Sequence, residues 1–176
     1  MVNQWHVIAG APSSGKTTII KELGLLGYNI VDEAARILIS SKLKNGISIE
    51  EMRKDDKSLQ REIMDLRLRL EGDAPSDQLA FFDTAIPDNL AYYKLCGLNT
   101  AELEEFSKGR YGRIFLLEPL PLEKDGIRIE DELKQKELYN AILDIYSRIG
   151  YKPIMVPSMP VKERVSFILR HINNDM

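Results

Sequence analysis

The clearest chemistry lies in one short segment near the N-terminus, Gly-Ala-Pro-Ser-Ser-Gly-Lys-Thr at positions 10–17. It fits the phosphate-binding pattern GxxxxGK[ST] at every specified position. The two glycines let backbone N–H groups turn toward phosphate oxygens, Lys16 supplies a cation and Thr17 supplies a hydroxyl for Mg²⁺. The segment predicts a nucleoside triphosphate site. We assign nucleotide contacts to the whole loop and the next residue, namely Gly10, Ala11, Pro12, Ser13, Ser14, Gly15, Lys16, Thr17 and Thr18.

Two carboxylates follow the next apolar segment, in Val31-Asp32-Glu33. At the end of a strand, Asp32 or Glu33 would face the γ-phosphate and accept a proton from an attacking hydroxyl. Arg36 lies three residues after Glu33, so on a helix the two side chains share a face. The alternative is an acidic helix N-terminus with Arg36 in a surface ion pair.

A third segment, Ala80-Phe81-Phe82-Asp83, is an apolar strand that ends in a carboxylate. This arrangement is typical of a Mg²⁺-holding aspartate, so Asp83 and Thr17 are the predicted metal residues. Asp88 opens the next helix and is expected to cap it. Tyr92 is a candidate to stack on a base or pyridine ring, and at least one of Tyr92 and Tyr93 is expected in the core.

The segment after the fourth apolar run contains two prolines and an Asp-Gly turn. Lys124 and Arg128 are placed to bring positive charge over a transferring phosphoryl group, so a lid is expected at about 119–131. An ordinary solvated loop is the alternative. By contrast, Arg61, Arg67 and Arg69 are expected to form ion pairs on a helix surface with Asp65.

Alternating apolar and helical patterns predict the elements that position these residues. The expected strands lie near 4–10, 28–32, 79–83, 112–118 and 153–156. The expected helices lie near 15–25, 33–44, 56–71, 88–96, 100–107, 130–149 and 160–172. Five strands joined by helices predict a three-layer α/β domain with a parallel sheet, whose site lies beyond the carboxyl ends of the strands.

Composition limits the remaining classes. A length of 176 residues fits one domain over 1–176, and a net charge of −3 argues against a nucleic-acid partner. Cys96 is the single cysteine, expected to be a small buried residue on a helix, and His6 and His171 lack metal-ligand company. No apolar run reaches membrane-spanning length and no signal peptide is evident, so a cytoplasmic location is expected.

These motifs together resemble the AAA-like small P-loop ATPase and kinase family, which includes the ribosylnicotinamide kinase domain of the bifunctional NAD-biosynthesis regulator. The resemblance rests on GAPSSGKTT, VDEAAR, FFDTAIPDNLAYY, RIFLLEPLP, DGIRIED and VPSMPVKERVSFIL. It implies a nucleoside- or nucleotide-kinase-like fold with a lid, ATP-Mg²⁺ on Gly15, Lys16 and Thr17, and Arg128 as the lid arginine. It also implies that Asp83 is the strand-end acidic residue and that Glu33 and Arg36 line the acceptor side. Many members carry Arg after the strand-end Asp, where this chain has Thr84.

The sequence therefore predicts a small-molecule kinase that transfers the γ-phosphoryl of ATP to a hydroxyl of a nucleoside-like metabolite. Two alternatives stay open. A nucleotide-dependent switch would act on a protein partner, and the charged segment Lys42–Asp56 could be its surface. A plain NTPase would turn over with water alone.

Overall fold

Five parallel strands form the centre of the protein, in the order β2-β3-β1-β4-β5. This computed structural model describes residues 4–120 and 129–173. The strands are β1 (Trp5–Ala9), β2 (Asn29–Val31), β3 (Ala80–Asp83), β4 (Arg113–Leu117) and β5 (Ile154–Val156). All five lie within the predicted ranges, and the sheet confirms the predicted three-layer α/β class.

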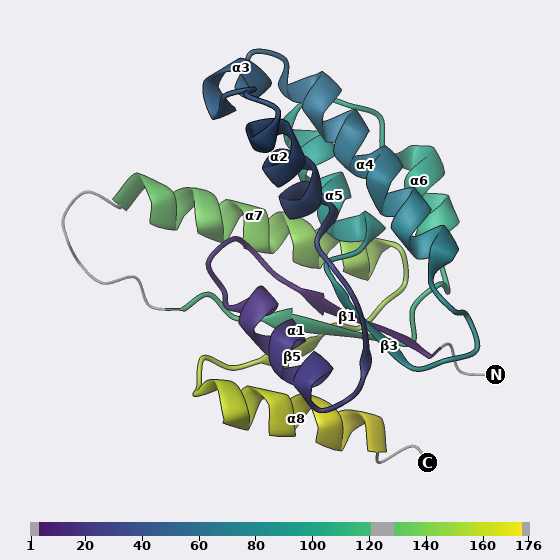
Figure 1. Cartoon of the computed structure of the whole chain (residues 1–176). Helices are drawn as coiled ribbons and strands as arrows, with labels where there is room; N and C mark the ends of the chain where they lie inside the picture. Colours follow the sequence, from purple (N-terminus) through teal and green to yellow (C-terminus); the bar gives the residue numbers. More distant parts are fainter. Residues whose placement is uncertain (1–3, 121–128, 174–176) are drawn as a thin grey trace.

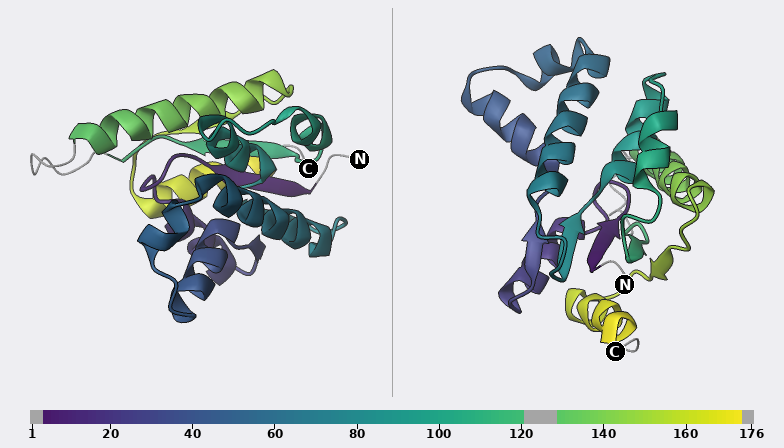
Figure 2. Two further views of the ribbon diagram at one scale, coloured as in Figure 1. Left: turned by 90° about the horizontal axis from the view of Figure 1, so that it is seen from above. Right: turned by 90° about the vertical axis from the view of Figure 1, so that its right-hand side faces the viewer.

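Helices pack on both faces of the sheet (Figures 1 and 2). They are α1 (Lys16–Leu25), α2 (Ala34–Lys44), α3 (Ile49–Arg53), α4 (Asp56–Asp73), α5 (Ile86–Leu95), α6 (Ala101–Ser107), α7 (Ile129–Arg148) and α8 (Val161–Asn173). Helices α1 and α8 cover one face, while α4, α5 and α7 contribute to the core on the other. The crossovers place successive parallel strands in one sheet, as the alternation of elements requires.

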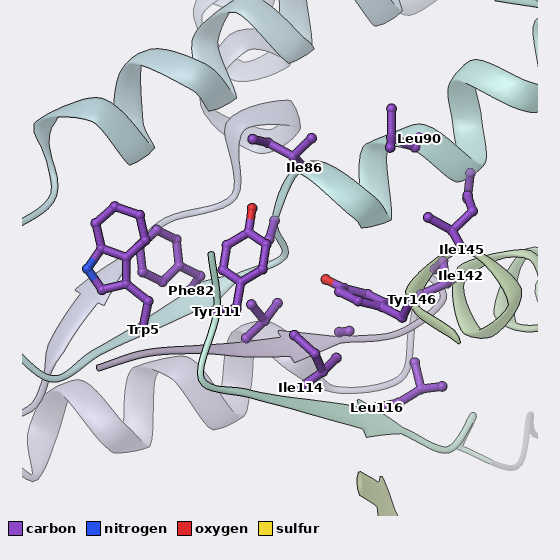
Figure 3. Close-up of a cluster of buried hydrophobic side chains, with 14 of the residues drawn as sticks. Trp5, Phe82, Ile86, Leu90, Tyr111, Ile114, Leu116, Ile142, Ile145 and Tyr146 are labelled. Carbon is purple, nitrogen blue, oxygen red and sulfur yellow. The ribbon is translucent and has the colours of Figure 1, made fainter. Parts of the chain in front are cut away.

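The alternation of side chains along each strand divides the core into two layers. In β1, Val7 belongs to the layer under α5 and α7, whereas Ile8 belongs to the layer under α1 and α8. Figure 3 shows the first layer, where Phe82 lies beside Trp5 and Tyr111 at one end and Ile145 and Tyr146 of α7 lie at the other. Because both faces of the central strands β1, β3 and β4 are buried, this part of the sheet is fixed on both sides and its carboxyl edge is a rigid platform.

Helices α2, α3 and α4 share a smaller apolar cluster and form an arm that stands apart from α5–α7 in the right-hand view of Figure 2. The five-residue helix α3 lies outside the predicted helices. Its start was nevertheless encoded: Ser48 accepts from the Glu51 N–H, and the Glu51 carboxylate accepts from the Ser48 N–H. This capping box stabilises a turn too short to show a helical period.

Two further expectations are wrong. Arg67 does not pair on the helix surface but is fully buried. Cys96 follows α5 rather than lying on it, and it is only partly buried. The proposed lid residues Lys124 and Arg128 lie outside the described residues. Within residues 4–120 and 129–173, no helix is long and apolar enough to cross a membrane.

Candidate functional site

The loop between β1 and α1 has the backbone conformation that its glycines allow. Gly10 and Gly15 have φ values of 146° and 88°. A Cβ on Gly10 would lie 3.0 Å from the Ser14 Oγ and 3.1 Å from the Leu117 carbonyl oxygen, so a side chain does not fit there. Ser13 also has a positive φ, 62°. The chain is thereby curled tightly before α1 begins at Lys16, which leaves the helix N-terminus directed at the cleft.

The predicted nucleotide residues divide into two groups. Most of them line a cleft, whereas Ala11 and Ser14 are buried beneath the loop. Lys16 is 8 % exposed, and its Nζ donates to the Ala11 carbonyl at 2.8 Å. Burial lowers the pKa of Lys16, while the charges of Glu33 and Asp88 oppose that shift. The ammonium is thus held close to the loop by its own backbone.

Thr17 and Asp83 form the predicted metal pair. The Thr17 Oγ1 donates to the Asp83 Oδ2 at 2.9 Å. Burial and then the negative charge of Glu33 raise the pKa of Asp83 to about 6. The other carboxylate oxygen, Oδ1, is buried and has no hydrogen-bond partner among the described residues. A hydroxyl beside a carboxylate is the oxygen set that Mg²⁺ uses together with nucleotide phosphates, so these residues fit the ion.

Within the described part of the chain, no group of three or more His, Cys, Asp or Glu side chains is arranged to hold a metal by itself. A cation at Thr17 and Asp83 would therefore need further oxygens from a bound phosphate chain or from water. This dependence is the pattern of a nucleotide-associated Mg²⁺ rather than a structural ion.

Glu33 and Arg36 stand beside this pair. The Arg36 Nε lies 3.5 Å from the Glu33 Oε2, and its Nη2 donates to the Thr17 Oγ1 at 3.2 Å. The structure therefore brings Glu33 and Arg36 to the phosphate loop and to one another. Asp32, by contrast, is exposed and is not one of the described residues that line the cleft.

A cleft of about 790 Å³ is lined by Lys16, Thr17, Glu33 and Arg36, while Asp83 is buried behind Thr17 and is not part of the lining. One end is formed by the phosphate loop, and the other by helices α2, α4 and α5 together with Arg53 at the end of α3. Tyr92 lines the cleft, while Tyr93 belongs to the core, as expected for one of the two. The far end is mixed in character, with Ile39, Leu59, Gln60 and Ile63 beside Arg53 and Asp56.

The family model described as "AAA domain" matches residues 5–164 of this sequence. The chain belongs to this AAA-domain family. No curated protein sequence matches it closely enough to count as a relative.

Solved structures share the fold of this AAA-domain protein at low sequence identity. Thymidylate kinase from Ehrlichia chaffeensis is similar with a TM-score of 0.65 and 14 % identity, over 96 % of this chain and 97 % of that one. NadR protein in complex with NR has a TM-score of 0.64 and 18 % identity, over 98 % of this chain and 50 % of that one. Shikimate kinase from Aquifex aeolicus vf5 has a TM-score of 0.58 and 19 % identity, over 97 % and 96 %. These neighbours show a kinase-like P-loop fold.

In this AAA-domain protein, two residues that the sequence motifs did not predict hold the phosphate loop in place. The Arg164 Nη1 on α8 donates to the Ser14 carbonyl at 2.7 Å, and its Nε donates to the Pro157 carbonyl at 3.0 Å. The Gln135 Nε2 on α7 donates to the Pro12 carbonyl at 2.7 Å. The contacts of Arg164 with Ser14 and of Gln135 with Pro12 join residues 150 and 123 positions apart, so no short sequence motif predicts them. The conformation of the loop therefore depends on both helices.

Asp88 caps α5, as expected, and also contacts α7 and the phosphate loop. Its Oδ2 accepts from the Ala85 N–H at 3.0 Å at the start of α5, which confirms the capping role. The same oxygen accepts from the Tyr146 hydroxyl at 2.6 Å, and the Oδ1 accepts a longer bond of 3.4 Å from the Gly10 N–H. Burial raises the pKa of Asp88. This carboxylate thus ties α5, α7 and the phosphate loop together.

Proposed function

We propose that this AAA-domain protein is an ATP-dependent small-molecule kinase that transfers the γ-phosphoryl group to a hydroxyl of a nucleoside-like metabolite. The carrying observation is that one cleft contains both the phosphate-binding Lys16 and Thr17 and the acceptor candidates Glu33, Arg36 and Tyr92. One end of the cleft is suited to a nucleotide and the other to a small organic molecule, and this arrangement fits a reaction between two bound molecules. The fold similarity to nucleotide and small-molecule kinases supports this proposal.

Each proposed donor-side role follows from position. Backbone N–H groups of the loop and the Lys16 ammonium bind the β- and γ-phosphates. Thr17 and Asp83 hold Mg²⁺, which when bound neutralises charge on the phosphate oxygens. Arg128, outside the described residues, is proposed from the family resemblance to close over the phosphates.

On the acceptor side, Glu33 is the proposed base because it lines the cleft, whereas Asp32 does not. The acceptor oxygen forms a bond to the γ-phosphorus as the bond from that phosphorus to the β–γ bridging oxygen breaks. The hydroxyl proton passes to a Glu33 carboxylate oxygen, and ADP leaves with the bridging oxygen. Arg36 and Tyr92 orient the acceptor.

The decisive experiment measures ADP release from ATP and Mg²⁺ with and without a pool of nucleosides, nicotinamide riboside and small alcohols. We expect release that depends on the acceptor pool and that is lost in Lys16→Ala. Turnover that no acceptor changes would instead identify an NTPase. Nucleotide binding without turnover, combined with nucleotide-dependent capture of a protein, would identify a switch. The segment Lys42–Asp56 stays a predicted partner surface in that case, although Arg53 and Asp56 also line the cleft.

A further inference from the structure

Arg67 is a fully buried guanidinium directly behind the end of β3. It lies on α4, one turn after the cleft-lining residue Ile63, so the two residues are on the same side of that helix. Its Nη2 donates to the Asp83 carbonyl oxygen and to the Thr84 Oγ1, both at 2.9 Å. Its Nε and Nη1 are buried without a hydrogen-bond partner among the described residues.

Burying a guanidinium is unfavourable unless an opposite charge and hydrogen bonds compensate it, and the buried carboxylate of Glu71 supplies an opposite charge nearby. The nearby carboxylate Glu71, one turn further along α4, is already bonded by other groups. The Tyr111 hydroxyl donates to it at 2.9 Å, the Ile86 N–H at 3.2 Å and the Arg110 Nε at 3.3 Å. The hydrogen bonds that the structure gives to Arg67 therefore both go to the turn after β3, one to the Asp83 carbonyl oxygen and one to the Thr84 hydroxyl.

That place is a strained turn at the proposed metal site. Thr84 has a φ of 64°, a left-handed conformation that costs energy for a β-branched residue. Its N–H continues the sheet by donating to the Ile8 carbonyl at 3.2 Å, so β3 stays paired up to this residue. Arg67 holds the carbonyl and the hydroxyl on the two sides of the turn. The Asp83 carboxylate, one residue earlier, then points to Thr17.

We infer that Arg67 is a positioning residue, which fixes the Asp83–Thr84 turn from inside the molecule and so sets the orientation of the Asp83 carboxylate toward a nucleotide-bound metal. This inference rests on the proposed function only in taking Asp83 as a metal residue. It does not depend on the identity of the acceptor or on whether phosphoryl transfer occurs.

The test separates metal binding from nucleotide binding. Mn²⁺ affinity in the presence of ADP is measured by electron paramagnetic resonance, and ADP affinity in EDTA is measured with a fluorescent ADP analogue. For Arg67→Met we expect Mn²⁺ affinity to fall at least tenfold, while ADP affinity in EDTA stays within twofold of the wild type. Arg67→Lys keeps the charge and one donor direction, so it should restore part of the Mn²⁺ affinity. Arg69→Met, an exposed change on the same helix, should leave both affinities within twofold.

Two results would overturn the inference: a folded Arg67→Met with Mn²⁺ affinity within twofold of the wild type, or equal losses of Mn²⁺ and ADP affinity. If Arg67→Met does not fold, a pair of Thr84 variants decides. Thr84→Gly accepts the left-handed conformation but removes the hydroxyl, and should weaken Mn²⁺ binding about tenfold. Thr84→Asn tolerates the same conformation and keeps an acceptor oxygen, so it should remain near the wild type. Wild-type Mn²⁺ affinity in Thr84→Gly would count against Arg67.

These measurements contain no acceptor, so they distinguish the two proposals. Loss of Mn²⁺ affinity in Arg67→Met together with no acceptor-dependent ADP release would support the positioning role and reject the kinase. Acceptor-dependent release with unchanged Mn²⁺ affinity in Arg67→Met would support the kinase and reject the positioning role.

Discussion

The two ends of the cleft are built in different ways. At the phosphate end, the loop is bonded by side chains from three helices, through Asp88, Gln135 and Arg164. At the acceptor end, helices α2 and α3 contribute long, exposed side chains, and the bonds of Arg36 go to Thr17 and Glu33 in the cleft itself rather than to the core. The Arg36 side chain is 63 % exposed, and Arg53 is exposed as well. One end is fixed by hydrogen bonds to the core, whereas the other depends on how a small helical arm packs.

This difference matches two different tasks, the binding of a phosphate chain and the recognition of one particular acceptor. Phosphate groups are common to all nucleoside triphosphates, so a rigid loop of backbone donors suits the first end. Recognition of the proposed acceptor would need side chains that fit one molecule, and the arm of α2, α3 and α4 lines this end of the cleft with Ile39, Leu59 and Arg53. Substitutions at the first end should therefore remove all turnover, while those at the second should change the acceptor preference.

Removal of the loop cation is expected to have the largest effect. Lys16→Ala takes away the ammonium that faces the phosphates, so acceptor-dependent turnover should fall by roughly 10³-fold. Steady-state ADP release checks this, with Lys152→Ala as the control because Lys152 is exposed, lies two residues before β5 and is outside the cleft. Equal effects of the two changes would contradict a phosphate-binding role for Lys16.

The carboxylates after β2 offer a matched pair at the boundary between the two ends. Glu33→Gln removes the proposed base, so kcat should fall about 10²-fold while nucleotide affinity stays unchanged. Asp32→Asn makes the same chemical change on an exposed neighbour outside the cleft lining, and kcat should stay within about twofold. Intact acceptor phosphorylation in Glu33→Gln would show that Glu33 is not the base.

Titration of Asp83 should sharpen the view of the phosphate end. Its pKa of about 6 means that the carboxyl is neutral below that pH, so Mn²⁺ affinity with ADP should fall about tenfold per pH unit below 6 and level off above it. Asp83→Asn should bind Mn²⁺ weakly at every pH and keep only the pH dependence that comes from the terminal phosphate of ADP, whose pKa is about 6. Electron paramagnetic resonance between pH 5 and 7.5 measures both, and a wild-type profile no steeper than that of Asp83→Asn would contradict the shift.

The same raised pKa has a consequence for stability. Because the folded state favours the protonated carboxyl, ionised Asp83 destabilises the metal-free protein above pH 6, and this penalty disappears below the ordinary value of 3.8. In EDTA, Asp83→Asn should therefore raise the melting temperature at pH 7 and have little effect near pH 3.5.

The residues of the phosphate end could be predicted from the sequence, whereas the buried residues that hold them in place could not. The pattern at positions 10–17 is contiguous, and Asp83 is found because parallel strands end at one edge of the sheet. Arg67 was misassigned because three arginines at 61, 67 and 69 look alike in a polar helix, and only the packing of α4 on β3 buries one of them. Arg164 and Ser14 lie 150 residues apart, so only the tertiary fold brings them together.

The acceptor end was predicted only in outline for a related physical reason. Its lining comes from alternate turns of several helices, and small rotations decide which side chains face the cleft. Glu33 and Asp32 are adjacent in the chain, yet only Glu33 lines the cavity. Helix α3 was missed altogether, although it brings Arg53 to the cleft.

The smallest expected effect concerns the two adjacent tyrosines of α5. Tyr92 lines the cleft and is half-buried, and burial followed by the charges of Glu33 and Asp88 raises its pKa, so its phenol stays neutral. Tyr92→Leu should raise the acceptor KM about three- to tenfold, the range of one lost aromatic contact, and should lower the melting temperature only slightly, because Tyr92 is only partly buried against the core cluster. Tyr93→Leu makes the same change in the core and should lower the melting temperature while leaving the acceptor KM unchanged. Similar losses of stability in both variants would mean that Tyr92 only packs the arm against α5, and the recognition of the acceptor would then fall to Arg36 and Arg53.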